Sequence, residues 1–184
     1  QSWRAAEDAD HIAVDMGPAR LAWDEVPLAG PADTTAVDLG ALAPATAVCH
    51  SMGNPHAVLF VDDAEAIDLA HIGPQLEHHP LFPDRANISF VTKVGPDRFR
   101  MRVWERGGGI TFACGSGACA VGVAVSRSGR GARRNEIIMD GGSVFIDWQD
   151  DGTLGGRVIM RGPVAYVFDG VLHGDLLALM RASA

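Results

Sequence analysis

Residues 104–119 read Trp-Glu-Arg-Gly-Gly-Gly-Ile-Thr-Phe-Ala-Cys-Gly-Ser-Gly-Ala-Cys, and they lead into the segment expected at the centre of the molecule. From residue 118 to residue 125 the chain continues as Ala-Cys-Ala-Val-Gly-Val-Ala-Val, which is apolar on every face of a helix. A helix that is apolar all round is normally buried, and small side chains let other elements approach it closely. The sequence therefore predicts a central buried helix, with Cys114 at or just before its N-terminus.

The predicted position of Cys114 has chemical consequences. Unpaired backbone N–H groups and the positive end of the helix dipole favour anions, both a thiolate and a bound carboxylate. A thiol at such a position commonly has a lowered pKa. We therefore expect a cysteine that transfers protons beside a carboxylate-binding site, in preference to an inert buried thiol. Cys119 lies five residues further on and turns away, so we expect a small core residue there.

The strand that precedes this helix supports the same site. In residues 98–103, apolar side chains alternate with arginines, which is the period-2 pattern of a half-buried strand. The same parity places Glu105 on the inward face with Phe99, Met101 and Val103. A carboxylate that faces inward needs a hydrogen-bond donor or a ligand, so Glu105 is a candidate functional residue. The arginines at 98, 100 and 102 are expected on the exposed face of the strand.

The pattern in the rest of the chain predicts mainly strands separated by glycine and proline turns. We expect strands at residues 11–16, 57–61, 87–91, 135–139, 143–148, 157–160 and 164–168. Residues 21–45 should be loop with short strands. A helical segment around Ile67 to Ile72 is expected to break at Gly73-Pro74, followed by a short turn of helix at 75–78, and 176–180 is expected to be a terminal helix. The predicted fold class is α+β: a β-rich, barrel-like sheet wrapped around one central buried helix.

The composition of the chain excludes several classes of function. The chain has 184 residues, with 15 Lys plus Arg, 23 Asp plus Glu and a net charge of −8, so nucleic acid and anionic membranes are unexpected partners. No apolar run approaches the ~20 residues that span a bilayer, and no secretory signal is visible. Three cysteines do not form a disulfide framework and suit a reducing compartment, so we expect a cytoplasmic location.

Three motifs together resemble the diaminopimelate epimerase family. They are the 104–119 stretch, Ser-Met-Gly-Asn-Pro-His-Ala-Val at 51–58, and Phe-Pro-Asp-Arg-Ala-Asn-Ile at 82–88, in the family's order and spacing. The resemblance spans residues 14–170. It implies two related domains, each with a barrel-like sheet around a helix. It also implies interconversion of LL- and meso-2,6-diaminopimelate in lysine and peptidoglycan biosynthesis, without pyridoxal phosphate, metal or any other cofactor, by two cysteines that come one from each domain.

The resemblance assigns roles to eight residues. Cys114 matches the cysteine of the second domain, while His56 and Glu105 match residues that set the protonation of the thiols. The residues expected to hold the amino acid's ends and its α-carboxylate are Asn54, Asn87, Glu105, Arg106, Gly115 and Ser116. Without the resemblance, Asn54 and Asn87 fit turn positions equally well, and a histidine after Asn-Pro, such as His56, is more often a plain turn residue.

The chain resembles only the second half of the family. The first half carries a Cys-Gly-Asn-Gly helix start, which this sequence lacks, and Cys49-His50 is no substitute. We expect a lead-in at 1–12 left from a first domain, the epimerase domain at 13–165, and a tail at 166–184 that packs on the first domain. Such a fragment, which begins at Gln1, is expected to be inactive alone. The family implies a homodimer, and Phe168 stands where the family commonly has a tyrosine linked to dimer contacts.

The sequence leaves other interpretations of the function open. One is another cofactor-independent racemase of the same architecture, such as a proline racemase relative. Another is a non-catalytic amino-acid-binding domain that keeps the pocket. A redox role for Cys114 and Cys119 lacks the Cys-x-x-Cys spacing, and a metal site lacks further ligands.

Overall fold

The computed structural model describes residues 11–171 and 173–175. Within them the strands are β1 (His11–Asp15), β2 (Ala47–Ser51), β3 (Pro55–Phe60), β4 (Asn87–Gly95), β5 (Arg98–Glu105), β6 (Gly109–Ile110), β7 (Arg134–Met139), β8 (Gly142–Gln149) and β9 (Arg157–Pro163). The helices are the 3₁₀ helix η1 (Gly40–Leu42) and the α-helices α1 (Leu69–Glu77) and α2 (Gly115–Arg127). Residues 1–10 and the expected helix at 176–180 lie outside the described residues, as does most of the 166–184 tail.

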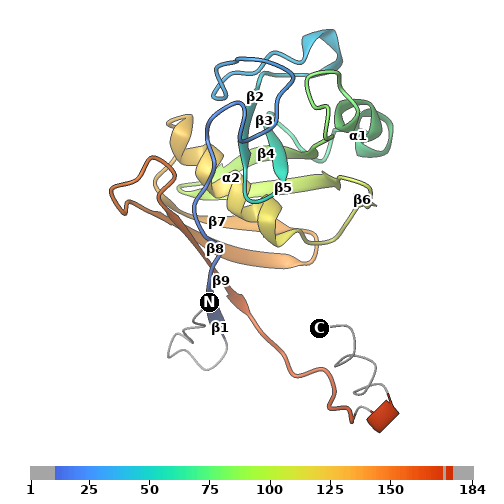
Figure 1. Cartoon of the computed structure of the whole chain (residues 1–184), viewed down its shortest axis with the longest axis vertical. Helices are drawn as coiled ribbons and strands as arrows, with labels where there is room; N and C mark the ends of the chain where they lie inside the picture. The colour runs from blue at the N-terminus through green and yellow to red at the C-terminus, as the bar shows by residue number, and fades with distance from the viewer. Residues whose placement is uncertain (1–10, 172, 176–184) are drawn as a thin grey trace.

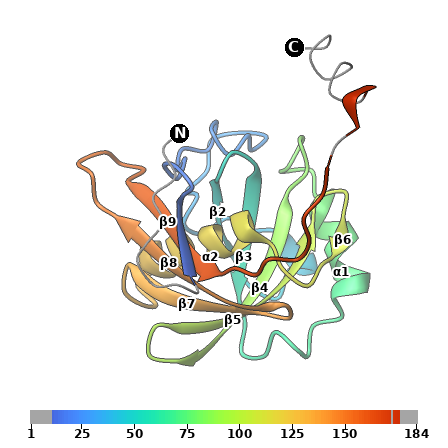
Figure 2. The same ribbon diagram turned by 90° about the horizontal axis from the view of Figure 1, so that it is seen from below.

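The strands form one curled sheet in the order β1-β9-β8-β7-β5-β4-β3-β2, with β6 paired to β5. The β3–β4 and β5–β7 pairs are parallel and the others are antiparallel. The segment after β1 bridges the open edges, since Met16 N donates to Val158 O of β9 and Arg20 N donates to Ser51 O of β2. The sheet therefore wraps around α2, as Figures 1 and 2 show.

Two apolar cores lie on opposite faces of this sheet. The inner core packs α2 against the concave face, where Phe99, Met101 and Val103 point inward from β5 as predicted. The outer core packs α1 and the 21–45 loops against the other face of β2, β3 and β4. Every residue from Ala57 to Leu59 is fully buried because both faces of β3 are covered. The predicted fold class, a β-rich sheet around one buried helix, is confirmed.

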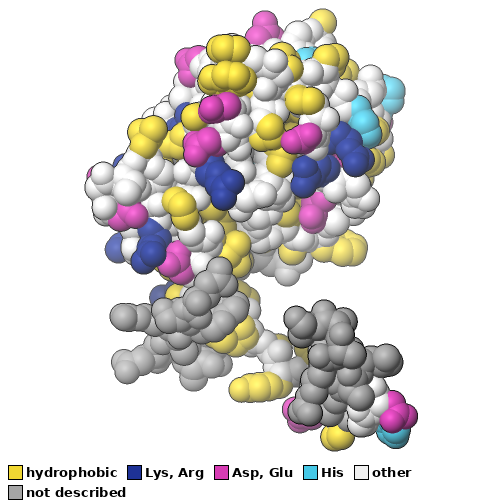
Figure 3. All heavy atoms as spheres, viewed as in Figure 1, with side chains coloured by type: hydrophobic (Ala, Val, Ile, Leu, Met, Phe, Trp, Pro, Cys, Tyr) yellow, Lys and Arg dark blue, Asp and Glu magenta, His cyan; other side chains and the backbone are white. Residues whose placement is uncertain are grey.

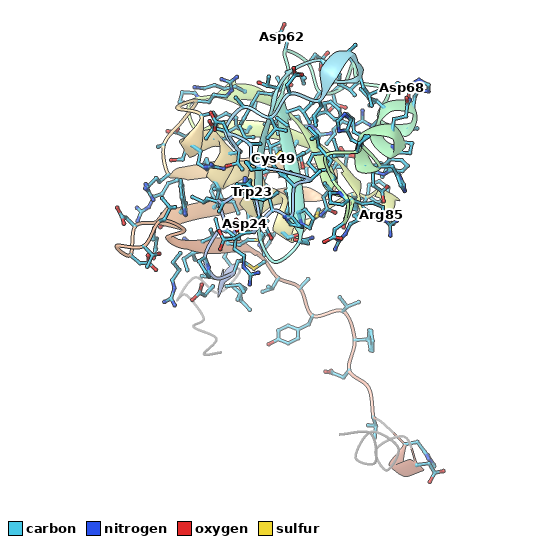
Figure 4. The ribbon with its side chains drawn as sticks, turned by 45° about the horizontal axis from the view of Figure 1, so that its top comes forward. Trp23, Asp24, Cys49, Asp62, Asp68 and Arg85 are labelled. Carbon is cyan, nitrogen blue, oxygen red and sulfur yellow. The ribbon has the colours of Figure 1, made fainter. Side chains whose placement is uncertain are left out.

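The predicted break at Gly73-Pro74 is wrong, because α1 continues through both residues. Asp68 caps the N-terminus of the helix by accepting from His71 N, and Figure 4 labels it beside α1. A Cβ on Gly73 would lie 2.6 Å from the Trp104 ring, so this glycine allows the helix to pack on the sheet. Pro74 removes one N–H from the helix, and the helix is held by packing on the sheet rather than by that hydrogen bond.

The predicted strand at 164–168 is also wrong. Residues 164–171 form no helix or strand, and Tyr166, Val167, Phe168 and Val171 are almost fully exposed. This segment leads away from the sheet in Figure 1. The remaining predicted strands are present, several of them longer than predicted, and 21–45 is loop with η1 and two isolated bridges. Among the described helices, none is both long enough and apolar enough to cross a membrane.

The arginine stripe of β5 is paired with acidic side chains. Arg98 binds Glu136 of β7, and Arg100 and Arg102 both bind Glu65. Arg100 also binds Asp140. The stripe faces away from α2 as predicted, although the Arg100 and Arg102 side chains are only 18% and 20% exposed.

Candidate active site

Cys114 is the N-cap of α2, as the sequence predicts. Its backbone is extended, and its Sγ accepts a hydrogen bond from Gly117 N at 3.4 Å. Gly117 has no room for a side chain, since a Cβ there would lie 2.8 Å from Met101 and 3.0 Å from the sulfur itself. The glycines after Cys114 therefore let the first turn of the helix close around the thiol. The first N–H groups of the helix, at Gly115 and Ser116, precede its internal hydrogen bonds and point toward the same end.

A chain of hydrogen-bond donors leads from His56 to this sulfur. His56 Nε2 lies 2.9 Å from Asn54 Oδ1, Asn54 Nδ2 donates to Ser116 Oγ at 3.4 Å, and Ser116 Oγ lies 3.7 Å from Cys114 Sγ. Because the amide oxygen of Asn54 faces the ring, Nε2 carries the proton of His56. The Ser116 hydroxyl is then free to donate to the sulfur. Each link favours negative charge on the thiol, although the last two contacts are long.

His56 is not a turn residue: it is the second residue of β3 and fully buried. Burial, followed by the nearby Arg106 charge, lowers its pKa to about 3, so the ring is neutral. His50 of β2 lies directly opposite His56 and is also fully buried. Burial lowers the pKa of His50 well below its usual value too, with His56 as the next cause. Among the described residues, His56 Nδ1 has no hydrogen-bond partner, and the ring of His50 has only the nearby backbone of Ala120.

Glu105 ends β5 on the inward face and is half-buried. Its Oε1 accepts from the Thr111 hydroxyl at 2.5 Å, which ties it to the segment that leads into Cys114. The carboxylate is near enough to the Cys114 thiol to act on its pKa. Glu105 and Cys114 thus approach the same point from two elements.

The expected lowering of the Cys114 pKa is not found. Cys114 is 6% exposed, and burial raises the pKa of its thiol. The hydrogen bonds from Gly117 and Ser116 lower this pKa, and the Glu105 carboxylate raises it further. Desolvation therefore outweighs the hydrogen bonds from Gly117 and Ser116, and the thiol is favoured over the thiolate.

The other two cysteines are core residues. Cys119 is fully buried in α2, as predicted, and burial raises its pKa to about 12. Cys49 lies in the interior on β2 (Figure 4), and burial raises its pKa to about 12 as well. All three cysteines are free thiols.

Asn87 and Arg106 meet at the turn behind Glu105. Asn87 Oδ1 accepts from Arg106 N at 2.9 Å, and Asn87 Nδ2 donates to Pro55 O at 3.0 Å. The Asn87 side chain thus joins the 51–58 motif to the 104–119 stretch. The Arg106 side chain is exposed and donates to Asp84 O of the 82–88 motif. All eight predicted site residues lie on these three motifs, which the fold brings together around the N-terminus of α2.

Sequence reasoning missed Glu77 and His50. Glu77 is a buried carboxylate at the end of α1 that binds Gly107 N, beside Glu105 and Arg106. The signal was present: the buried residues of α1 are Leu69, Gly73, Leu76 and Glu77, a helical stripe that includes one acid. A carboxylate on the apolar stripe of a helix needs a partner.

A cavity of about 540 Å³ lies elsewhere, on the outer face of β7, β8 and β9, and contains none of the predicted site residues. Its charged lining includes the pairs Arg98–Glu136 and Arg134–Asp147. Acidic and basic side chains are likewise interspersed on the face seen in Figure 3.

Comparison with known proteins places the chain in a family. The diaminopimelate epimerase family model matches residues 48–167, which contain every residue of the site described above. A diaminopimelate epimerase of Rhodospirillum centenum is 55% identical, with 90% of this chain and 56% of the relative covered. One of Acidiphilium cryptum is 54% identical, with 91% of this chain and 59% of the relative covered. The chain therefore spans less than two thirds of the length of these relatives.

Solved structures support the fold alone. A phenazine biosynthesis protein of the PhzF family from Bacillus anthracis superimposes with a TM-score of 0.56 at 11% identity, over 93% of this chain and 64% of the other. A predicted epimerase from Pseudomonas aeruginosa superimposes with a TM-score of 0.51 at 18% identity, over 86% of this chain and 57% of the other. With its helix-capping cysteine and its three motifs inside the matched region, this chain belongs to the diaminopimelate epimerase family.

Proposed function

We propose that this chain forms the second domain of a diaminopimelate epimerase, which interconverts LL- and meso-2,6-diaminopimelate without a cofactor. The observation that carries the proposal is Cys114 at the N-cap of α2, with the donor chain from His56 on one side and Glu105 on the other. Family membership supports the substrate class. Cytoplasmic location and a role in lysine and peptidoglycan biosynthesis follow from the same assignment.

In this proposal Cys114 is one of two groups that act on opposite faces of the α-carbon. As a thiol, it gives its proton to the carbanion-like α-carbon, and the electron pair of the S–H bond stays on sulfur. The thiolate that forms accepts hydrogen bonds from Gly117 N and Ser116 Oγ. For the reverse direction the thiol loses its proton to Glu105 and then removes the α-proton. The raised pKa of Cys114 favours the acid role in the free protein.

The remaining site residues hold the substrate. The backbone N–H groups of Gly115 and Ser116 bind the α-carboxylate at the positive end of α2. The amide groups of Asn54 and Asn87, together with Glu105 and Arg106, hold the polar ends of the amino acid. Neutral His56 donates through Asn54 and Ser116 and so keeps the thiolate stabilised without adding a charge.

The first cysteine and the other half of the substrate contacts come, in this proposal, from a first domain. The coverage of only 56% to 59% of two relatives supports this arrangement. Residues 1–12 form the lead-in, 13–165 the domain and 166–184 the tail that packs on the first domain. The exposed apolar side chains of Tyr166, Val167 and Phe168 suit such packing. Phe168 keeps the ring and lacks the hydroxyl that the family's tyrosine brings to its homodimer.

The test compares the isolated chain with a chimera in which the first domain of the Rhodospirillum centenum relative precedes it. Each protein is incubated with LL-diaminopimelate in D₂O, and formation of the meso isomer and deuterium at the α-carbon are followed. We expect turnover by the chimera, loss of turnover in the chimera with Cys114→Ala, and no turnover by the isolated chain. Full turnover by the isolated chain would refute the second-domain proposal.

A non-catalytic amino-acid-binding domain is the second candidate, favoured by the raised pKa of Cys114. This candidate predicts that a folded chimera binds diaminopimelate by calorimetry yet incorporates no deuterium. Proline offered to the same chimera separates the epimerase from another racemase of the same architecture.

A further inference from the structure

Glu77 is a buried carboxylate with three donors from three segments. It is 3% exposed and is the last residue of α1. Its Oε2 accepts from Trp104 Nε1 at 2.6 Å, and its Oε1 accepts from Gly107 N at 3.0 Å. Arg85 reaches Oε1 at 3.4 Å from the surface, on the same side of the molecule as α1 in Figure 4. Charge-assisted bonds of this kind are stronger than neutral ones.

The two short bonds flank the residues that matter to the site. Trp104 and Gly107 lie on either side of Glu105 and Arg106, so Glu77 clamps the chain before and after them. Asn87 holds the backbone amide of Arg106, which lies between Trp104 and Gly107, since its Oδ1 accepts from Arg106 N at 2.9 Å. Two successive backbone amides, at Arg106 and Gly107, are therefore held by two buried side chains.

The backbone of this turn needs such support. Gly107 has φ +74°, and Gly108 N donates back to Glu105 O at 3.0 Å, which closes a tight turn. Gly107 to Gly109 are three glycines in a row, the most flexible sequence the backbone offers. The pairing of Glu105 with Gly109 holds one side of this turn, and the bonds from Glu77 and Asn87 limit the conformations of the other.

A neutral residue would not replace Glu77. Both Trp104 Nε1 and Gly107 N are donors, so the group between them must accept on both of its atoms. A glutamine has one acceptor and one donor atom, and it would leave one of the two donors unpaired in a buried place. Burial is the largest single influence and disfavours the charge of Glu77. The bonds from Trp104 and Gly107, together with nearby His78 and Arg85, outweigh it and lower the pKa of Glu77, so the group stays ionised at neutral pH.

We propose that Glu77 is a positioning residue for the reaction: by holding Trp104 and Gly107 it fixes Glu105 beside Cys114 and presents Arg106 to the substrate. This inference rests on the proposed function for the roles of Glu105 and Arg106. Glu77 itself touches neither the thiol nor the substrate site.

The test uses the 184-residue chain and three variants: Glu77→Gln, Glu105→Gln and Leu76→Ala. Leu76 is the fully buried neighbour of Glu77 in α1, so Leu76→Ala weakens the same helix without touching the turn. The first readout is the pH dependence of Cys114 alkylation by iodoacetamide, mapped by mass spectrometry between about pH 7 and pH 11. The second is the amide hydrogen exchange rate of Gly107 by NMR, under conditions where every variant is folded.

We expect Glu105→Gln to lower the alkylation midpoint, because it removes a negative charge that opposes the thiolate. Glu77→Gln should lower it too, by at least ~0.5 pH unit, because the released turn takes Glu105 away and admits water. Gly107 exchange should become at least ~10-fold faster in Glu77→Gln. Leu76→Ala should leave the Cys114 alkylation midpoint unchanged and should not speed Gly107 exchange more than exchange elsewhere in the chain.

An unchanged midpoint in Glu77→Gln, together with Gly107 exchange no faster than in Leu76→Ala, would overturn the inference. If Glu105→Gln itself leaves the midpoint unchanged, the coupling of Glu105 to Cys114 fails, and with it the proposed function. The Gly107 exchange rate still decides whether Glu77 holds the turn, so the two failures are distinguishable.

Discussion

The two helices lie on opposite faces of one curled sheet and contribute to the site in different ways. α2 is enclosed by the sheet and offers its N-terminus, where Cys114 meets polar partners. α1 lies outside and offers its last residue, Glu77, which reaches the turn after β5. Each helix presses a glycine against the sheet, Gly122 on Ile146 and Gly73 on Trp104. In the proposed mechanism the inner helix carries the reacting group and the outer helix orients its neighbours, so chemistry and positioning would lie on opposite faces of the sheet.

The largest effect should separate the two cysteines of α2. In the chimera described above, Cys114→Ala should lower kcat by at least ~10²-fold, because proton transfer by a positioned group contributes about 10²–10⁴-fold. Cys119→Ala should leave kcat within about threefold, because that thiol is enclosed in the core. Steady-state epimerisation rates at saturating substrate measure both. If Cys119→Ala were as inactive as Cys114→Ala, the position of Cys114 at the N-terminus of α2 would not explain its role.

The next effect concerns the glycines that press each helix on the sheet. Gly122→Ala should destabilise the fold by about 3 kcal/mol, because its Cβ would lie 2.5 Å from Ile146, which is buried and cannot move aside. Gly73→Ala should cost about 1–2 kcal/mol, since the Trp104 ring is only half-buried and can shift toward solvent.

Urea unfolding gives both free energies, and Gly30→Ala is the control, because nothing lies within 4 Å of a Cβ at that position. The control should stay within about 0.5 kcal/mol of the parent. Equal losses at Gly122 and Gly73 would show that the outer helix is packed as rigidly as the inner one.

This difference between the helices also explains what the sequence could predict. The α2 segment is apolar all round and starts at Cys114-Gly-Ser-Gly, so its burial and N-cap follow from residue type alone. The parity of β5 likewise places Glu105 inward. Gly73-Pro74 predicts a break because the local signal for a turn is the same as that for close packing, and only the position of Trp104 distinguishes them.

The parts of the site that failed prediction depend on long-range contacts. The pKa of Cys114 was expected to be lowered by the helix end, but desolvation raises it, and burial is not visible in a local motif. The two partners that Glu77 holds in the turn, Trp104 and Gly107, lie 27 and 30 residues away along the chain. The strand expected at 164–168 has the residues of a strand and no described neighbour to pair with.

A third effect is the pH dependence of stability, which should come from two buried histidines. The pKa of His56 is lowered to about 3 by burial and Arg106, and burial also holds the pKa of His50 well below its usual value. The unfolded chain binds a proton at each histidine near pH ~6.5, whereas the folded chain does not. Stability should therefore fall as the pH falls below ~6.5, by about 2 kcal/mol per histidine between pH 7 and pH 5.

Urea unfolding at the two pH values measures this loss, and His50→Leu should reduce it by about 2 kcal/mol. The exposed His71 of the outer helix provides the control, because His71→Gln should leave the acid loss unchanged. An acid loss that is the same in His50→Leu as in the parent would show that His50 is charged or solvated in the folded state.

The smallest effect is expected from the ion pairs on the outer surface of the sheet. Glu136 binds Arg98 at 2.7 Å, but the Arg98 side chain is 52% exposed, so water and salt screen the pair. Glu136→Gln should cost no more than about 1 kcal/mol, and the difference should shrink further in high salt. Urea unfolding at low and high salt measures this, with Glu77→Gln as the buried comparison. Because Glu77 leaves donors unpaired when its charge is removed, its loss should be larger and should persist in salt. A salt-resistant loss at Glu136 as large as that at Glu77 would contradict the distinction between a buried carboxylate that fixes a turn and a surface carboxylate that joins two strands.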